Sequence, residues 1–269
     1  MSLFEFIKKH TDLQFGVCDI SALKDALIPC RAALRLPKDA KRVVCFLFPY
    51  KVEENPPKNI SRYAAVPDYH GICLERLEIL KEKLSAEYKE YTFECFVDNS
   101  PIPEVRAAAA AGLGKIGQNG LLINEKYGSF VFLGEIVTDM PLECEDNTAF
   151  CENCGLCRTM CPVGLDKMRC LSALTQKKGE LSAEEQELLL SQESVWGCDI
   201  CQNVCPHNKT AERTDICEFL DGYRDRYILG ENTQNRAYAW RGERVIRRNA
   251  ELQNIAQVVA ADTTEEKHE

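Results

Sequence analysis

A dense group of cysteines in the second half of the chain has the spacing of iron–sulfur ligands. The sequence reads Cys-x2-Cys-x2-Cys-x3-Cys-Pro over residues 151–162, then an isolated Cys170, then Cys-x2-Cys-x3-Cys-Pro over residues 198–206. Three thiolates on one tight loop can bind three irons of a [4Fe–4S] cube, whereas the cysteine before the proline binds the other cube. The second run lacks one cysteine, and Cys170 is placed to supply it.

This pattern predicts two clusters with four cysteine ligands each. The ligands of the first are predicted to be Cys151, Cys154, Cys157 and Cys205. The ligands of the second are predicted to be Cys161, Cys170, Cys198 and Cys201. Two structural zinc sites are the alternative, since four thiolates also suit zinc. The complete set of eight with both Cys-Pro steps favours the clusters, in the arrangement of a two-cluster ferredoxin.

The composition indicates a reduced, unexported protein. The chain has 15 cysteines, yet it starts without an apolar signal segment or a twin-Arg pair, so metal ligation is expected rather than disulfides. It also has no apolar run long enough to span a bilayer, and a cytoplasmic location is expected. The cysteines outside the cluster set are predicted to be mainly small core residues. They are Cys18, Cys30, Cys45, Cys73, Cys95, Cys144 and Cys217.

Asp98 is the candidate acid. It lies in Val97-Asp98-Asn99-Ser100-Pro101, where a predicted strand ends at a carboxyl group and a turn follows. Ligands and catalytic carboxylates often lie at such strand ends. An aspartate that only closes its own turn through a side-chain hydrogen bond is the structural alternative.

Two further motifs could carry chemistry. Residues 112–117 read Gly-x-Gly-x-x-Gly, the dinucleotide fingerprint, but they follow a predicted helix rather than a strand. A helix C-cap is therefore favoured over nicotinamide binding. His70, in Asp68-Tyr69-His70-Gly71, could bind a metal, including cobalt. The corrinoid pattern Asp-x-His-x-x-Gly would need glycine where Cys73 stands, so a lower cobalt ligand is not expected, and a capping or surface histidine is the alternative.

Alternating strands and helices surround these motifs, which predicts an α/β or α+β domain before the cluster domain. Helices are expected at residues 1–9, 69–88, 104–111 and 182–190, and strands at residues 14–18, 42–48, 91–97, 121–124 and 129–138. The last strand is nearly all apolar and should be central. The expected domains are residues 1–142, residues 143–220 with the clusters, and an Arg-rich helical tail at residues 221–269.

Taken together, these stretches resemble the epoxyqueuosine reductases, cobalamin-dependent iron–sulfur enzymes of the last step of queuosine synthesis in tRNA. The resemblance rests on ordered segments from about residue 42 to residue 249. They include Ser-Arg-Tyr-Ala at 61–64, Asp-Tyr-His at 68–70, Val-Asp-x-Ser-Pro at 97–101, Ala-Gly-Leu-Gly at 111–114, Gly-Ser-Phe-x-Phe-Leu-Gly-Glu at 128–135, the eight cysteines, Trp-Gly-Cys-Asp at 196–199 and Arg-Arg-Asn at 247–249.

The resemblance implies an α+β chain in which a cobalamin-binding α/β domain, related to that of reductive dehalogenases, precedes a ferredoxin-like domain with two [4Fe–4S] clusters. It places Asp98 as the general acid of epoxide reduction. Residues implied near the cobalamin are Arg62, Tyr63, Asp68, Tyr69, His70, Ser100, Asn124 and Ser129. The clusters would supply low-potential electrons. The implied partners are tRNA that carries epoxyqueuosine and an electron donor such as a flavodoxin or ferredoxin.

The chain departs from the family pattern in ways that leave its substrate open. Longer members continue into a helical-repeat domain that helps to hold tRNA, so a short form is expected here. The usual Gly-Lys-Asn and Pro-Trp-Asn become Gly117-Gln118-Asn119 and Pro206-His207-Asn208. The net charge is −9, although seven arginines lie between residues 224 and 248. That run could bind phosphate, or it could be a solvated face paired with acidic neighbours.

Three functions are compatible with the sequence. The first is a short epoxyqueuosine reductase. The second is a cobalamin-dependent reductase of the same fold that acts on a small molecule. The third is an iron–sulfur electron carrier without substrate chemistry, although a carrier would not need the long segment before Cys151.

Overall fold

The long apolar strands at residues 42–49 and 131–138 form the middle of a four-stranded sheet. The computed structural model describes residues 2–265, with side chains described as far as residue 254. In spatial order the strands are β1 (Phe15–Asp19), β2 (Arg42–Pro49), β6 (Val131–Thr138) and β3 (Phe93–Phe96). All three strand pairs are antiparallel, so the arrangement is α+β. The prediction that residues 129–138 form a central strand is confirmed.

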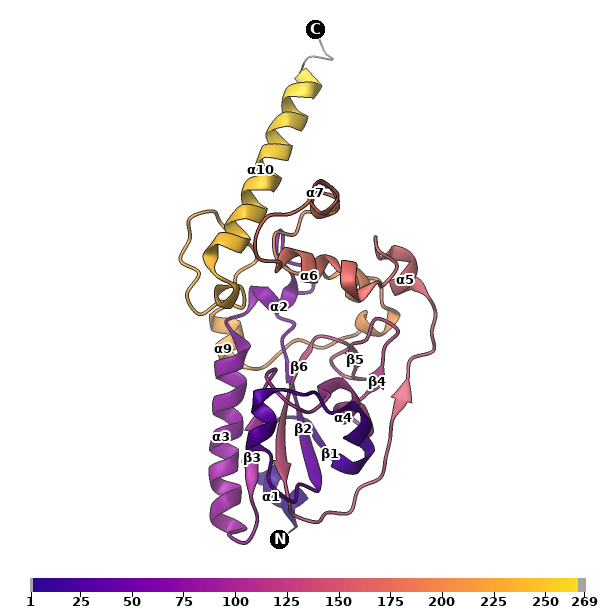
Figure 1. The fold of residues 1–269 in the computed structure, drawn as a ribbon, viewed down its shortest axis with the longest axis vertical. Helices are drawn as coiled ribbons and strands as arrows, with labels where there is room; N and C mark the ends of the chain where they lie inside the picture. Colours follow the sequence, from indigo (N-terminus) through magenta and orange to yellow (C-terminus); the bar gives the residue numbers. More distant parts are fainter. Residues whose placement is uncertain (1, 266–269) are drawn as a thin grey trace. The chain divides into compact units, whose positions relative to one another are not determined.

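Helices cover both faces of this sheet (Figure 1). A further helix, α1 (Leu3–His10), lies at the N-terminus. The helix α3 (Tyr69–Glu87) buries Cys73, Leu77, Leu80 and Leu84, a four-three-four spacing that keeps one stripe on the sheet. Ile72, next to Cys73, is only half-buried, because Cys73 has the helical phase that faces the sheet. Gly134 of β6 allows the close packing, since a Cβ there would lie 2.9 Å from Leu77.

The helix α4 (Glu104–Ala110) packs on the other face of the sheet, against β1, β2 and β6. Its last four residues are buried alanines, whose small side chains permit close approach. Gly112 ends the helix with φ +76°, and its N–H donates to the Ala109 carbonyl. The N–H of Leu113 donates to the Ala108 carbonyl, which completes a Schellman motif. The first glycine of Gly-x-Gly-x-x-Gly is therefore a helix C-cap, as the sequence favoured.

Shorter elements complete this part of the chain. Two 3-10 helices, η1 (Ile20–Ala26) and η2 (Arg31–Arg35), follow β1. A second sheet has the order β5 (Leu122–Ile123), β4 (Lys115–Ile116) and β7 (Ala149–Phe150). In it β4 pairs antiparallel with β5 and parallel with β7.

The cluster region is built from short helices and one long helix, α10 (Glu243–Glu265), around an aromatic core. Trp196 and Tyr238 are fully buried there, with ring centroids 5.9 Å apart. Its helices are α2 (Arg62–Ala65), α5 (Leu156–Met160), α6 (Leu171–Thr175), α7 (Ala183–Leu190), α8 (Ile200–Asn203), α9 (Cys217–Asp221) and α10 (Glu243–Glu265). Short 3-10 turns lie at η3 (Lys167–Arg169), η4 (Pro206–Asn208) and η5 (Ala239–Arg241). The predicted helix at residues 182–190 is confirmed, and Ser182 and Glu185 form a capping box at its start.

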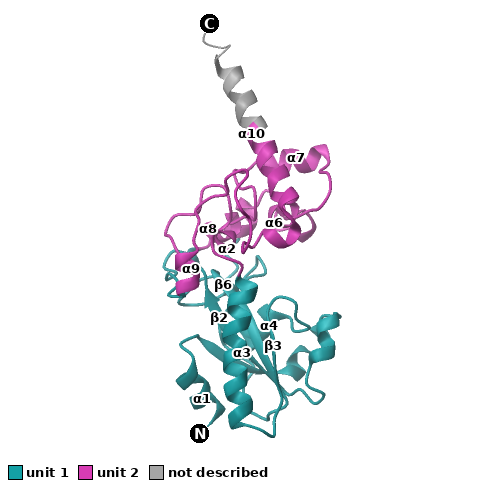
Figure 2. Cartoon of the chain, turned by 90° about the vertical axis from the view of Figure 1, so that its left-hand side faces the viewer, with its two compact units in different colours: residues 1–50, 69–155, 206–216 teal, residues 51–68, 156–205, 217–269 magenta. Residues whose placement is uncertain are grey.

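The chain forms two compact units, and neither is continuous in sequence (Figure 2). The first unit contains residues 1–50, 69–155 and 206–216, and the second contains residues 51–68, 156–205 and 217–269. This division differs from the three consecutive domains expected from the sequence. Among the described residues, no helix is both long enough and apolar enough to cross a membrane.

Candidate active site

Asp98 lies on a turn directly after β3, in a left-handed backbone conformation. Its φ is +57°, a value that aspartate and asparagine adopt more readily than most residues. The turn is tied by hydrogen bonds from the N–H of Asn99 to the Val97 carbonyl and from the N–H of Ser100 to the Asp98 carbonyl. The Asp98 N–H donates to a carboxylate oxygen of Glu104 at 2.8 Å. The backbone thus presents the Asp98 side chain at the end of a buried strand.

The Asp98 carboxylate contacts the imidazole of His70. The distance from Nε2 of His70 to Oδ2 of Asp98 is 3.2 Å. The side chains are 34% and 58% exposed, respectively, so a ligand can reach the pair. His70 lies in the first turn of α3, beside Tyr69, whose ring stacks on Phe132 with centroids 3.9 Å apart. The structure therefore brings together Tyr69, His70 and Asp98, three of the predicted site residues.

Two glutamates of the same unit have raised pKa values, Glu135 fully buried and Glu104 half-buried. Glu135, in the middle of β6, is 1% exposed, and neither of its carboxylate oxygens has a hydrogen-bond partner among the described residues. Burial, together with the charge of Glu104, raises the pKa of Glu135 well above its ordinary value. Burial also raises the pKa of Glu104 to about 7, against the opposing hydrogen bond from the Asp98 backbone. Both acids therefore retain protons at a pH where exposed glutamates are ionised.

Three other predicted site residues of the first unit are engaged in the fold itself. Ser100 is buried, and its hydroxyl accepts from the N–H of Ile102. Asn124 donates to the Leu113 carbonyl and to Gln14, and its oxygen accepts from two N–H groups of the following turn. Ser129 and Asn208 bond reciprocally at 2.8 Å. These residues shape the loops around the site.

Arg62, Tyr63 and Asp68, also predicted near a cofactor, belong to the second unit. The Arg62 guanidinium is buried, donates to Asn203 at 2.5 Å and lies 3.8 Å from a carboxylate oxygen of Asp199. The same Asp199 oxygen accepts the N–H of Arg62 at 2.7 Å. Burial raises the pKa of Asp199 to about 6, and the hydrogen bond and charge of Arg62 counteract that rise. Arg62 thus neutralises a buried carboxylate.

Replacing Arg62 by Ala is expected to destabilise the second unit by about 3–5 kcal/mol, because Asp199 would be left buried without its counter-charge. Both tryptophans of the chain, Trp196 and Trp240, lie in this unit, so tryptophan fluorescence during denaturation reports on it. Arg226→Ala is the matched control, since its pair with Asp225 is exposed and should contribute less than about 1 kcal/mol. Equal effects of the two substitutions would contradict the proposed role of Arg62.

The cysteines of the predicted second cluster all lie in the second unit. They are Cys161, Cys170, Cys198 and Cys201. Burial raises the pKa of the Cys198 thiol to about 12, and the charges of Cys201 and Cys170 add to the shift. In the described part of the chain, no three Cys, His, Asp or Glu side chains converge on one point as a single metal ion would require. A [4Fe–4S] cube does not require such convergence, because each thiolate binds a different iron.

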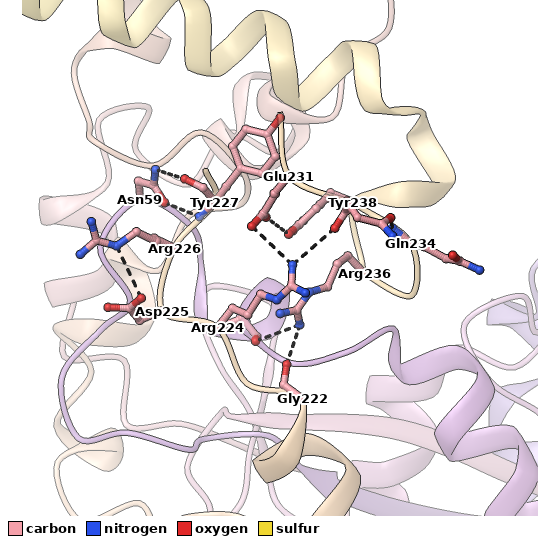
Figure 3. Close-up of polar contacts among 12 residues, drawn as sticks. Asn59, Gly222, Arg224, Asp225, Arg226, Tyr227, Glu231, Gln234, Arg236 and Tyr238 are labelled. Carbon is pink, nitrogen blue, oxygen red and sulfur yellow. Dashed lines mark hydrogen bonds and ion pairs between the residues drawn. The ribbon is translucent and has the colours of Figure 1, made fainter. Parts of the chain in front are cut away.

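Five of the seven arginines in the run have partners within the second unit, and Figure 3 shows three of them, Arg224, Arg226 and Arg236. Arg236 is 3% exposed and donates to the carbonyls of Ala65 and Gly222. Arg224 pairs with Glu231 at 3.4 Å and Arg226 with Asp225 at 3.6 Å. Further along, Arg247 pairs with Glu251, and Arg248 donates to the Lys177 and Gly179 carbonyls. These contacts favour the reading of the run as a paired surface rather than a phosphate site.

Comparison with known proteins gives a family for the first part of the chain and a cluster-binding domain for the second. A family model described as epoxyqueuosine reductase QueG, DUF1730, matches residues 31–99, and a 4Fe-4S double cluster binding domain matches residues 150–208. An epoxyqueuosine reductase from Lactococcus garvieae is 32% identical over 242 residues, which is 79% of this chain and 68% of that protein. The chain belongs to the epoxyqueuosine reductase family.

Other epoxyqueuosine reductases match at similar levels. The enzyme from Pseudomonas aeruginosa is 37% identical over 199 residues, 70% of this chain and 54% of its own length. The chain spans about half the length of most curated relatives it matches. A crystal structure of selenomethionine-labelled epoxyqueuosine reductase superposes with a TM-score of 0.77 at 25% identity, covering 93% of this chain and 79% of that one. A crystal structure of epoxyqueuosine reductase with an epoxyqueuosine-modified tRNA stem loop superposes with a TM-score of 0.79, also at 25% identity. The match covers 93% of this chain and 80% of that one.

Glu104 and Glu135, whose pKa values are raised in the structure, are not among the site residues expected from the sequence. The signal for Glu135 was a single acidic residue in the otherwise apolar strand 131–138. Glu104 opens a helix, where a glutamate normally favours the positive helix end, so its partial burial had no sequence signal.

Proposed function

We propose that this chain reduces the epoxide of epoxyqueuosine in tRNA to the alkene of queuosine. The observation that carries the proposal is the half-exposed Asp98–His70 pair, in a chain of this family that also has a double-cluster domain. An acid and a base in contact can deliver a proton to an oxygen leaving group. The clusters would deliver the electrons.

The reaction consumes two electrons and two protons, and it releases the epoxide oxygen as water. Asp98 would protonate that oxygen as the carbon–oxygen bond breaks, and His70 would hold the carboxyl group in position. The electrons would come from a low-potential one-electron donor such as a flavodoxin or ferredoxin, in the cytoplasm. Proton delivery of this kind contributes about 10²–10⁴-fold to an enzymatic rate.

The residues present suit both cofactors of the family. For the clusters, the donor set is thiolate only, and all eight cysteines lie within the segment that matches a double cluster binding domain. For cobalamin, the Tyr69–Phe132 stack beside a half-exposed polar pair suits a flat macrocycle with polar edges. The residues of the first unit proposed to hold it are Tyr69, His70, Ser100, Asn124 and Ser129. Reduced cobalamin would supply the strongly reducing centre that opens an epoxide.

Cobalamin is expected to bind without its own base or any protein side chain below the cobalt. The reason is that Cys73 replaces the glycine of the Asp-x-His-x-x-Gly pattern, and His70 is engaged with Asp98. Electron paramagnetic resonance of the cob(II)alamin form should show no nitrogen superhyperfine splitting. Splitting from an axial nitrogen would refute this expectation, and a chain that binds no cobalamin would favour the electron-carrier reading.

A direct test of the tRNA substrate is expression in a bacterium that lacks its own epoxyqueuosine reductase. Mass analysis of digested tRNA should show queuosine in cells with the wild-type chain and epoxyqueuosine in cells with the Asp98→Asn variant. Persistence of epoxyqueuosine in both strains, with the chain present and loaded with iron, would contradict the tRNA substrate and favour a small-molecule substrate.

A further inference from the structure

The second unit contains a pocket of about 440 Å³ beside a predicted ligand of the second cluster. Its walls come from η3, α6, α7 and η5, and α7 packs against both α6 and α10. Met168 and Arg169 of the pocket directly precede Cys170 in the chain. Cys170 is also the N-cap of α6, and its carbonyl accepts the N–H of Leu174, another pocket residue, at 2.9 Å. The pocket therefore lies next to the backbone that carries Cys170.

Positively charged side chains outnumber negatively charged ones in the lining of this pocket. The cations are Arg169, Lys177, Lys178 and Arg241, and the anions are Glu184 and Glu185. Lys177 is paired with Glu185, with 2.6 Å between Nζ and Oε1. The other three cations have no carboxylate partner among the described residues. Four cations and two anions give the lining a net charge of +2, whereas the whole chain has a net charge of −9.

Arg241 is held against an aromatic ring in the wall of the pocket. Its Cζ atom lies 3.7 Å from the centroid of the Trp240 ring, and its Nε atom is buried without a hydrogen-bond partner among the described residues. Apolar side chains are exposed nearby, since Met168 is 91% exposed and Trp240 is 53% exposed. Methionine, tryptophan and arginine are residue types that are enriched where proteins bind one another. The pocket and its surroundings therefore suit a protein partner with a negatively charged surface.

We propose that this basic pocket is the docking site of an acidic one-electron carrier protein, which reduces the second cluster. The inference rests on the proposed function, because the reduction of one epoxide consumes two electrons. Each encounter would oxidise the carrier by one electron and reduce the cluster by one electron, so two encounters would serve one turnover. A local positive surface on an acidic chain steers an acidic carrier toward the cluster and away from the rest of the chain. Contacts between electron-transfer partners are small and transient, so one pocket with a few charges is sufficient.

Carbodiimide cross-linking of the reconstituted chain to an acidic flavodoxin maps the contact directly. The reagent joins a carboxylate to a lysine amine that touches it, and peptide mass mapping identifies the lysine. Lys178 should be cross-linked, whereas Lys209, an exposed lysine of the first unit, should not. The cross-link should disappear at about 1 M salt, where charges are screened beyond roughly 3 Å. Cross-links at other lysines with none at Lys178 would overturn the proposed docking site.

Stopped-flow reduction of the clusters by reduced flavodoxin, without tRNA, measures the effect of the charges. Lys178→Glu and Arg169→Glu should each slow the second-order step about tenfold at low salt and match the wild type at about 1 M salt. Arg226→Glu makes the same change in net charge at an exposed arginine outside the pocket, and it should change the rate by less than about twofold. Reduced methyl viologen, a small cation, should reduce the clusters of all these variants at the wild-type rate.

The outcomes separate this docking site from the proposed function. Equal rates with flavodoxin for Lys178→Glu and wild type would overturn the docking site. So would a wild-type chain that methyl viologen reduces and flavodoxin does not. Weaker tRNA binding by Lys178→Glu, with an unchanged rate from flavodoxin, would also overturn it and make the pocket a nucleic-acid surface. A chain that takes electrons from flavodoxin at this pocket but leaves epoxyqueuosine unchanged would refute the proposed function, and the docking site would stand.

Discussion

Asp98→Asn should lower turnover by about 10²–10⁴-fold, the usual contribution of a general acid. Asparagine has the size of aspartate and can still contact His70, but it has no carboxyl proton to transfer. The iron content and cobalamin binding should be unchanged. Turnover of the purified, reconstituted variant, with cluster and cobalamin absorbance recorded on the same sample, measures both parts of the expectation.

The left-handed backbone at residue 98 makes this substitution a clean test. Asparagine tolerates φ +57° at least as well as aspartate, so the turn should survive the change. Asp39→Asn, at an exposed aspartate of the same unit, controls for the loss of one negative charge. If Asp98→Asn turned over at nearly the wild-type rate, Asp98 would be a turn residue only, and the proton donor would have to be sought elsewhere.

Cys170→Ser should remove one whole cluster. Eight cysteine ligands correspond to two [4Fe–4S] clusters and about eight irons per chain, and a serine hydroxyl is a much poorer iron ligand than a thiolate. The variant should retain about four irons after anaerobic reconstitution. Cys170 lies between η3 and α6, in the same unit as Cys161, Cys198 and Cys201. Iron and sulfide analysis with visible absorbance gives the count.

Cys217 provides the control for this experiment. It is exposed, and its thiol contacts the adjacent Glu218 rather than another cysteine. Cys217→Ser should therefore keep both clusters and the wild-type spectrum. Full iron content in Cys170→Ser would show that the second cluster has a different fourth ligand.

The sequence predicted those parts of the fold that depend on local pattern. The strand at residues 42–49, the helix at residues 69–87 and the glycine C-cap at residue 112 each have a periodicity or residue type that specifies them. The antiparallel order of the sheet was not predictable, because pairing between distant strands leaves no local signal. Asp98 was expected at the end of a strand in a parallel α/β sheet. In the structure the sheet is antiparallel, and a turn with positive φ at residue 98 presents the side chain.

The sequence also did not predict that residues 51–68 belong to the second unit, because their contacts are with residues far away in the chain. Ile60 forms a bridge with Trp196, and Arg62 neutralises Asp199, but both partners lie more than 100 residues away in the sequence. For the cysteines outside the cluster set, the predicted burial holds at some positions and fails at another. Cys18, Cys45, Cys73 and Cys95 are buried as predicted, whereas Cys217 is exposed, because it opens a short helix rather than an apolar strand.

The most direct test of the proposed function is a reaction with the purified chain. The chain is reconstituted with iron, sulfide and cobalamin, reduced by a chemical donor of low potential, and supplied with tRNA that carries epoxyqueuosine. Mass analysis of the digested tRNA should then show epoxyqueuosine replaced by queuosine in the wild type and retained with Asp98→Asn. A fully loaded wild-type chain that leaves epoxyqueuosine unchanged would contradict the proposal.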